Sequence, residues 1–262
     1  MIKVLTAGIV GSRSTLEALE RIPSLGLDGF EVEFVRRINI SDLIAREIKK
    51  ANKKCYLSVH APYFINLASK DKEKVNASVK RIVESCRKAF LMGAENVVFH
   101  PGFYTAGTRK QTYEVIKKRV MEILEQIKTY ESIRLCPETS GKPSQFGSLE
   151  ELLNLRRDTG CFLTVDFAHL WARSNGTMSP RMILERIEAE DDEILKSMHA
   201  HFSGIEYGKK GEKNHLMLED SDFPWKQLAE SLKEFKVRGS IVCESPDPLS
   251  DALLFKKALV KF

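Results

Sequence analysis

The stretch CYLSVHAPYFINLASKDKEKVNASVKRIVESCRKAFLMGAENVVFHPG, residues 55–102, places two short apolar runs on either side of one long charged segment. The apolar runs, within residues 54–61 and 96–102, are rich in β-branched residues, as buried strands are. In the charged segment the apolar residues recur every three or four positions, which predicts a helix that ends before Gly93. These apolar residues are Val75, Val79, Ile82, Val83, Cys86, Phe90 and Leu91. The stretch therefore predicts a strand, a helix and a second strand, the repeating unit of an α/β fold.

The same alternation runs along the whole chain. Short apolar segments occur at residues 2–10, 29–35, 54–61, 96–102, 134–140, 161–169, 197–204 and 240–245. Helix-periodic segments follow them at residues 14–22, 41–52, 72–93, 111–130, 148–158, 179–189, 224–235 and 249–262. Ser41, Ser148 and the Ser179–Pro180 pair stand where helices would begin, which supports these boundaries. Eight such units in 262 residues predict one domain, residues 1–262, with the α/β fold of a single (β/α)8 TIM barrel; a doubly wound open sheet is the alternative.

The composition is that of a soluble globular protein, because 43% of the residues are hydrophobic and 29% are charged. The formal net charge of +5 permits a nucleic-acid partner without demanding one. The amino-terminal segment lacks a signal-peptide pattern, and no apolar run is long enough to span a membrane. The five cysteines are scattered and form no CxxC pair, so we expect buried thiols in a reducing cytoplasm.

Histidines and carboxylates gather where the predicted strands end. The carboxyl ends of barrel strands form the rim at which chemistry takes place. Six consecutive strands bring such a side chain to this rim, and all six histidines of the chain are among them. The residues are His60, His100, Glu138, Asp166 with His169, His199 and His201 with His215 in the following loop, and Glu244.

This concentration of imidazoles and carboxylates predicts bound metal ions. Without a cation, so many converging polar groups would repel one another or remain unsatisfied. Imidazole and carboxylate ligands suit zinc, and also manganese or iron. The donors exceed what one tetrahedral ion needs, so we expect two or three ions. Such ions lower the pKa of a bound water to about 7 and clamp the oxygens of a phosphoryl group, which indicates hydrolysis.

The motifs at these positions resemble those of the endonuclease IV family, the trinuclear-zinc apurinic/apyrimidinic endonucleases on a xylose-isomerase-like barrel. The resemblance covers roughly residues 55–248, and the first two strands carry no diagnostic motif. The matching motifs, in order, are SVHAPYFINLAS, VFHPG, PETSG, TVDFAH, HFSG, NHL and CES.

The resemblance implies a zinc-dependent endonuclease of base excision repair, in which a metal-bridged hydroxide cleaves the phosphodiester 5′ of an abasic site. Two carboxylates, Glu138 and Glu244, would be central to catalysis. The implied ligands are His60 and His100 for one zinc, Glu138 as a bridge, Asp166, His201 and Glu244 for the second zinc, and His169 and His215 for the third. His199 competes with His201 for its role, and we prefer His201 because it lies nearer the carboxyl end of the strand.

The resemblance also implies double-stranded DNA with abasic sites as the partner of a monomer. Tyr63 and Phe64 follow His60 at the place where side chains of the family enter the DNA at the lesion. Arg36 and Arg37 after the second strand are candidates to hold a backbone phosphate. Lys213, with Lys209 and Lys210, is a similar candidate in the loop after the seventh strand. Trp171 and Arg173 either contact DNA or pack the rim.

One position departs from the family pattern. An aspartate usually stands two residues before the histidine of NHL and shares the third zinc with it, but here that position is Lys213. A lysine would repel the ion. We therefore expect Glu212 or a water to complete the ligands around His215, and we expect this ion to bind more weakly than the other two.

Two other functions are compatible with the sequence. A xylose-isomerase-like sugar isomerase or epimerase would hold a single divalent metal with Glu138, Asp166, His201 and Glu244. The additional histidines have no obvious use in such an enzyme. The other possibility is a metal-bearing DNA-binding protein that has lost catalysis.

Overall fold

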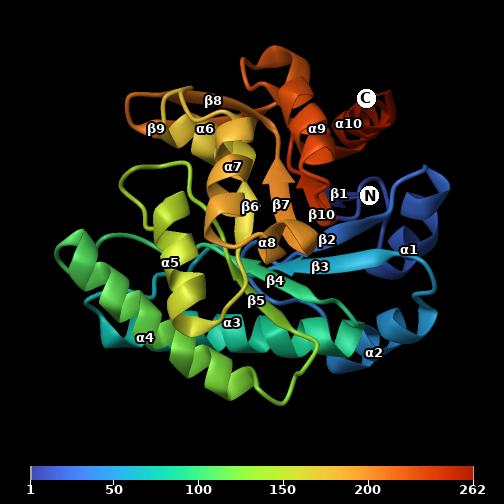
Figure 1. Cartoon of the computed structure of the whole chain (residues 1–262). Coiled ribbons are helices and arrows are strands. Elements are labelled where there is room, and N and C mark those ends of the chain that lie inside the picture. Colours follow the sequence, from blue (N-terminus) through green and yellow to red (C-terminus); the bar gives the residue numbers. More distant parts are fainter. Residues whose placement is uncertain (1, 262) are drawn as a thin grey trace.

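The structure is a computed structural model that describes residues 2–261. Eight parallel strands form its centre (Figure 1). The strands are β1 (Lys3–Ala7), β2 (Gly29–Glu33), β3 (Tyr56–His60), β4 (Asn96–Phe99), β5 (Arg134–Pro137), β6 (Thr164–Asp166), β7 (Met198–Phe202) and β10 (Gly239–Cys243). Their order in the sheet is β5-β4-β3-β2-β1-β10-β7-β6. The two end strands approach each other through a parallel bridge between Glu138 and Thr164. The sheet is therefore a nearly closed barrel, which confirms the predicted (β/α)8 fold and not the open doubly wound sheet.

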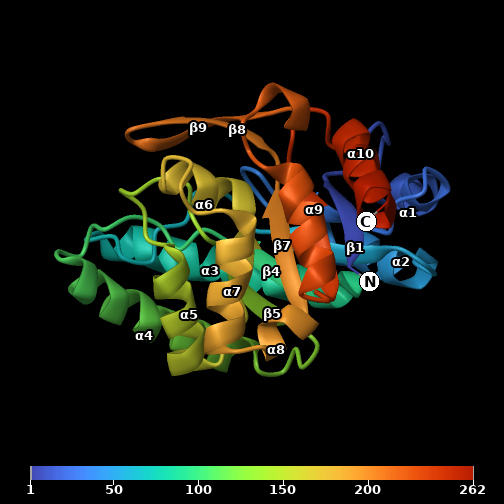
Figure 2. The same ribbon diagram turned by 45° about the horizontal axis from the view of Figure 1, so that its top comes forward.

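Helices surround the barrel between successive strands (Figures 1 and 2). They are α1 (Thr15–Ser24), α2 (Asp42–Ala51), α3 (Lys72–Met92), α4 (Arg109–Ile127), α5 (Leu149–Thr159), α6 (Phe167–Arg173), α7 (Pro180–Glu190), α8 (Glu193–Lys196), α9 (Trp225–Glu234) and α10 (Pro248–Lys261). Ser41, Ser148 and Ser179 each accept a hydrogen bond from the first turn of the next helix, so all three predicted caps are confirmed. No helix within residues 2–261 is both long and apolar enough to cross a membrane.

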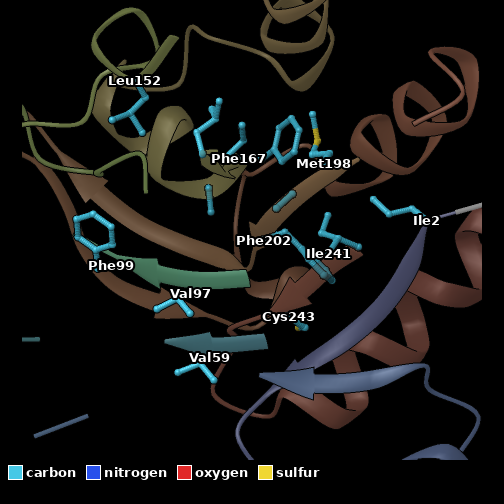
Figure 3. Close-up of a cluster of buried hydrophobic side chains, with 14 of the residues drawn as sticks. Ile2, Val59, Val97, Phe99, Leu152, Phe167, Met198, Phe202, Ile241 and Cys243 are labelled. Atoms are coloured by element: carbon cyan, nitrogen blue, oxygen red, sulfur yellow. The ribbon is translucent and has the colours of Figure 1, made fainter. Parts of the chain in front are cut away.

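The two faces of the barrel strands differ in chemistry. Outward-facing side chains such as Val59, Val97 and Phe202 join the apolar layer between sheet and helices, part of which Figure 3 shows. In this layer the rings of Phe202 and Phe255 lie 4.2 Å apart. The inward faces of the same strands carry buried polar side chains, among them Glu31, Ser58, Asn96, Thr164, His199, His201 and Ser240. The barrel therefore encloses polar groups, which need partners inside it.

Two segments differ from the sequence prediction. β6 covers only residues 164–166 of the predicted strand at 161–169. It ends at Asp166 because the Asp166 carboxylate accepts a hydrogen bond from the His169 amide at 2.7 Å and so starts α6. The segment after β7 is a hairpin of β8 (Gly204–Gly208) and β9 (Gly211–Leu216), followed by a 3-10 turn, η1 (Leu218–Asp220), and not the predicted loop. Charged side chains hide this hairpin in the sequence, since its outer face is solvated. It lies against α6 at one end of the barrel (Figure 2).

Candidate metal centre

Glu138 lies at the centre of the rim, just beyond β5. Its Oε2 is 3.2 Å from His60 Nε2 and 3.3 Å from His100 Nε2. Its Oε1 is 3.4 Å from His169 Nδ1 and 3.3 Å from His201 Nδ1. This side chain is only 1% exposed, so a buried carboxylate contacts imidazoles from four different segments. The predicted candidates from β3 to β7 therefore converge on one side chain.

Three sets of side chains have ligand atoms that lie within 4.8 Å of one another around this carboxylate. The sets are His60, His100 and Glu138; Glu138, Asp166, His169 and Glu244; and His169, Glu212 and His215. His201 joins the second set, because its Nδ1 is 3.3 Å from Glu244 Oε1 as well as from Glu138. Every residue that the sequence nominated as a metal ligand lies in this cluster, and its ligand role stays a prediction.

The orientation of the histidine rings suits metal binding. Nδ1 of His60 is 2.8 Å from the Ala61 carbonyl oxygen, and Nδ1 of His215 is 2.9 Å from the Glu244 carbonyl oxygen. A carbonyl accepts only, so each Nδ1 carries the proton and donates it. The Nε2 lone pair is then left on the side of the cluster, which is how such hydrogen bonds orient metal-binding imidazoles.

Unsatisfied atoms in the cluster also fit a cation. Glu138 Oε1, Asp166 Oδ2 and His201 Nδ1 are buried and make no well-formed hydrogen bond within the described chain. Buried polar atoms in proteins nearly always have a partner. Carboxylate oxygens and imidazole nitrogens are the donors that zinc, manganese and iron accept. The residues therefore fit divalent ions.

Protonation in the metal-free cluster is uneven. Burial by itself lowers the pKa of His60, but the carboxyl groups of Glu138, Glu33 and Glu31 together outweigh it and raise this pKa to about 10. Burial lowers the pKa of His100 to about 4 and raises that of Asp166 to about 6. Burial also disfavours the charged form of Glu138, yet His100 and His201 hold its pKa well below the usual range. A metal ion would therefore displace a proton from His60 while meeting a carboxylate that is already charged.

A fully buried network lies beneath the cluster, and the sequence analysis missed it. Glu31 on β2 approaches both histidines of β7, with Oε1 3.1 Å from His201 Nε2 and Oε2 3.0 Å from His199 Nε2. The other nitrogen of His199 is 2.8 Å from the Ser240 hydroxyl. We call Glu31, His199, His201 and Ser240 the floor. His201 Nε2 faces Glu31 and His201 Nδ1 faces Glu138, whereas His199 lies below His201 and does not reach the cluster.

Glu31 and Glu33 alternate in GFEVEFV at the end of β2, and this pattern was the available signal for them. Both face inward by the period-two alternation of a strand. Glu33 lines the cavity above the cluster, and burial raises its pKa to about 8. Neither residue is a histidine, and both lie inside the predicted strand at residues 29–35 and not at its end, so the sequence did not mark them as site residues.

The β8–β9 hairpin supplies the third donor set. Glu212 Oε2 and His215 Nε2 lie 3.6 Å and 3.5 Å, respectively, from His169 Nε2. Lys213 points elsewhere: its Nζ is 2.9 Å from Glu206 Oε1, and 55% of its side chain is exposed. Glu212 thus stands near His215 where the sequence analysis expected it.

A β-bulge explains why Glu212, and not Lys213, faces the cluster together with His215. In the hairpin Glu206 pairs with Asn214 and Tyr207 pairs with Glu212, so Lys213 is one extra residue in β9. In a regular strand Lys213 and His215 would share a face, because side chains alternate with period two. The bulge shifts the alternation by one residue, so that Glu212 and His215 face the cluster together.

Gly141 makes room for Glu212. A Cβ atom on Gly141 would lie 2.6 Å from both Cβ and Oε2 of Glu212, which is closer than real contacts allow. The Glu212 amide also donates a hydrogen bond to the Gly141 carbonyl at 3.0 Å. The β5–α5 loop therefore fixes the position of the hairpin carboxylate.

A cavity of about 440 Å³ opens above the cluster and is lined by residues of all three donor sets. Tyr63 lines this cavity and is 56% exposed. Phe64, Arg36 and Arg37 are exposed on neighbouring loops but do not line the cavity. Of the predicted DNA contacts, the structure therefore brings only Tyr63 to the cavity wall.

Trp171 and Arg173 pack the rim. The Arg173 guanidinium donates hydrogen bonds to the backbone carbonyls of Ser140, Lys142 and Gln145 at 3.2, 2.6 and 3.0 Å. Trp171 Nε1 donates to an Asp222 carboxylate oxygen at 3.1 Å. Both side chains hold loops around the cavity, and this supports the packing alternative that the sequence had left open.

Known proteins that are similar to this chain include both endonucleases and sugar epimerases. Residues 19–259 match a family model described as a xylose isomerase-like TIM barrel. An endonuclease IV from Thermus thermophilus superposes with a TM-score of 0.77 at 22% identity, covering 99% of this chain and 100% of the other. A D-tagatose 3-epimerase-like protein superposes equally well, with a TM-score of 0.77 at 22% identity over 99% and 96% of the two chains. At this level of identity the superpositions show the fold alone.

Sequence relatives include an uncharacterized protein of Methanocaldococcus jannaschii, which is 36% identical over 96% of this chain and 94% of its own length. A probable endonuclease 4 of Mycoplasma mobile is 28% identical over 64% of this chain and 62% of its own length. The sequence similarity to this probable endonuclease 4 thus covers about two thirds of the chain, whereas the family match covers nearly all of it.

Proposed function

Since this chain belongs to the xylose isomerase-like TIM-barrel family, we propose that it is a metal-dependent endonuclease that hydrolyses the phosphodiester 5′ of an abasic site in DNA. The observation that carries this proposal is the arrangement of three donor sets that share Glu138 and His169. Shared donors would place the ions side by side, the arrangement that clamps the attacking and leaving oxygens in two-metal phosphodiester hydrolases. The partial similarity to proteins named probable endonuclease 4 supports the same activity.

The residues divide into three groups in this proposal. His60, His100 and Glu138 would hold the first ion; Glu138, Asp166, His201 and Glu244 would hold the second, with His169 within reach of it; His169, Glu212 and His215 would hold the third. When bound, divalent ions at these places supply a nucleophilic water near neutral pH and neutralise charge on the phosphate. We propose zinc as the native metal, with manganese or iron as alternatives.

The side chains of the cluster contribute orientation. Glu138 belongs to the first two groups and touches four imidazoles, so it sets the spacing between the groups. Glu244 touches His201 with its carboxylate and accepts from His215 with its backbone carbonyl, so it couples β7 to the hairpin. Both carboxylates therefore act in catalysis by holding the reacting groups in one geometry.

The cavity mouth is proposed to receive the damaged duplex. Tyr63 on the cavity wall replaces stacking that is lost when a nucleotide leaves the helix, and exposed Phe64 extends this apolar surface. Arg36, Arg37 and Lys213 are proposed phosphate contacts, since all three are exposed cations on loops or strands that flank the rim.

We also place the protein in the cytoplasm and expect a monomer. The five cysteines are free and buried, as is usual in a reducing compartment. Size-exclusion chromatography with light scattering measures the oligomeric state directly.

A sugar isomerase or epimerase remains the competing function, because Glu138, Asp166, His201 and Glu244 alone would suffice for one ion. The first and third donor sets argue against it. His60, His100, Glu212 and His215 add two further groups of donors, for which a single-metal enzyme has no use.

A nicking assay combined with metal analysis tests the proposal. The purified protein is analysed for metal per chain and then incubated with a duplex that contains one tetrahydrofuran abasic analogue, with an undamaged duplex as control. We expect two to three ions and a single nick on the 5′ side of the analogue that a chelator abolishes. One ion, no nick and conversion of a ketose would establish the sugar enzyme instead. Tight binding of the damaged duplex without a nick would indicate lost catalysis.

A further inference from the structure

Phe103 stands out among the residues that line the cavity. It follows β4 by four positions and is 44% exposed, although phenylalanine is normally buried. Together with Tyr63 it gives the cavity a second aromatic side chain that is open to solvent. These two residues come from different loops, the β3–α3 loop and the β4–α4 loop.

The backbone around Phe103 is fixed to the Tyr63 loop. The Phe103 amide donates to Asn66 Oδ1 at 3.4 Å, and the Asn66 amide group donates to the Thr105 hydroxyl at 3.3 Å. Gly102 has a φ of +115°, and a Cβ atom there would lie 2.6 Å from Asn66 Cα. The two loops therefore approach each other closely, and their contacts fix the backbone of Phe103 relative to the loop that carries Tyr63.

The other side of Phe103 is fixed as well. Phe103 forms an antiparallel bridge with Gln145, and the Phe146 amide donates to the Gly102 carbonyl at 3.0 Å. The Gln145 carbonyl is in turn held by Arg173. Phe103 is thus exposed on a backbone that is held from both sides, and an apolar side chain presented in this way is preorganised for contact with a partner.

The chemistry of the cavity indicates which partner this is. The metal cluster at the base of the cavity offers carboxylates and imidazoles that would hold metal ions, and bound metal would in turn bind phosphate. The mouth of the cavity offers aromatic faces. A strand with an abasic site has lost one stacked base, so the neighbouring bases expose flat apolar surfaces. Aromatic side chains stack on such surfaces with little regard to sequence. We infer that Phe103 stacks on a base next to the lesion and acts beside Tyr63; this inference rests on the proposed endonuclease function.

The test compares metal-loaded wild type with Phe103→Ala, Phe103→Leu and Phe103→Trp on a tetrahydrofuran duplex with 2-aminopurine beside the lesion. Loss of one base–aromatic stack lowers kcat/KM for nicking about 5- to 100-fold in the Ala variant. The Leu variant keeps apolar volume but no ring, so we expect a similar loss. The Trp variant restores both nicking and the quenching of 2-aminopurine fluorescence. Metal content is unchanged in all three variants.

Met121→Ala is the matched control, because Met121 is 53% exposed on α4 and does not line the cavity. If wild type nicks the duplex and Phe103→Ala nicks it equally well with the same fluorescence response, the inference about Phe103 is overturned while the proposed function stands. If the Leu variant retains full activity, stacking is not the reason for any loss in the Ala variant, and the inference is again overturned. If wild type does not nick the duplex, both the function and the inference are lost.

Discussion

The floor and the β8–β9 hairpin supply donors to the same cluster in opposite ways. The floor residues Glu31 and His201 come from barrel strands and are completely buried. Glu212 and His215 come from a two-stranded hairpin outside the barrel and are partly exposed. His201 is held by a carboxylate on the side opposite the cluster, whereas the place of Glu212 depends on one bulge and on Gly141.

This difference predicts unequal metal sites. A donor that is already fixed by the barrel loses little freedom on binding an ion, but a donor on a hairpin loses more. The barrel also tolerates few changes in strand register, because a slip would move every inward side chain to the outer face. We therefore expect the two barrel sites to bind firmly and the hairpin site to bind more weakly.

Glu138→Gln tests what the two regions share and has the largest expected effect. The amide has one oxygen and no charge, so it cannot serve two donor sets at once. Nicking should fall by roughly 10²–10³-fold or more, and metal content should fall to about one ion or less. Single-turnover nicking and metal analysis by mass spectrometry measure both. Activity close to that of wild type would remove Glu138 from the centre of the proposal.

Glu31→Gln tests the floor alone. Breaking a buried ion pair by removing one partner's charge costs roughly 3 kcal/mol of unfolding free energy. Loss of an outer carboxylate that orients a metal-binding histidine costs about 10–100-fold in metal affinity. Urea unfolding of the metal-free protein and zinc competition assays measure these effects. Glu206→Gln is the control, since Glu206 is 44% exposed and pairs only at the surface. Equal effects of the two substitutions would show that the floor does not orient His201.

Glu212→Gln tests the hairpin alone. It should remove one ion per chain, leave the other ions bound and lower nicking by about 10–100-fold, an effect of the size seen when metal affinity is weakened. Lys213→Ala provides the contrast, because an exposed ion pair is worth only about 0–1 kcal/mol. Loss of the ion in Lys213→Ala with retention in Glu212→Gln would reverse the assignment that the bulge supports.

The pH dependence of metal affinity gives the smallest effect per step, about tenfold for each pH unit. In the metal-free protein the pKa of His60 is about 10, so this ring carries a proton at neutral pH that a metal ion must displace. Affinity at the first site should therefore rise with pH, by about tenfold per unit for one proton released, and should weaken as pH falls. Competition with a chromogenic chelator between about pH 6 and 8 measures the slope. An affinity independent of pH would show that His60 loses no proton on binding.

Part of this organisation was accessible from the sequence. The period of the hydrophobic residues predicted the barrel, and its predicted helix caps are confirmed. The resemblance is likewise confirmed by the family match, and the partial similarity to proteins named probable endonuclease 4 agrees with it. The nominated ligands lie together because strand ends of a parallel barrel meet at one rim.

Other parts of the site and of the fold could not be predicted from the sequence. The alternation in GFEVEFV indicated only that Glu31 faces inward, and it did not show the contact with His199, which lies 168 positions further along the chain. The hairpin was taken for a loop because solvent-facing charges outnumber its apolar residues. Phe103 carries no recognisable motif, and its exposure depends on hydrogen bonds to Asn66 and on a bridge to Gln145.

The sequence by itself determined the succession of strands and helices and the kind of side chain at each strand end, because both depend on local periodicity. Only the tertiary structure decided which nitrogen of His201 faces the cluster, and that Glu212 rather than Lys213 stands beside His215. The reason is physical: ring orientation and strand register are set by partners distant in the chain, and a single extra residue in β9 exchanges one face of the strand for the other.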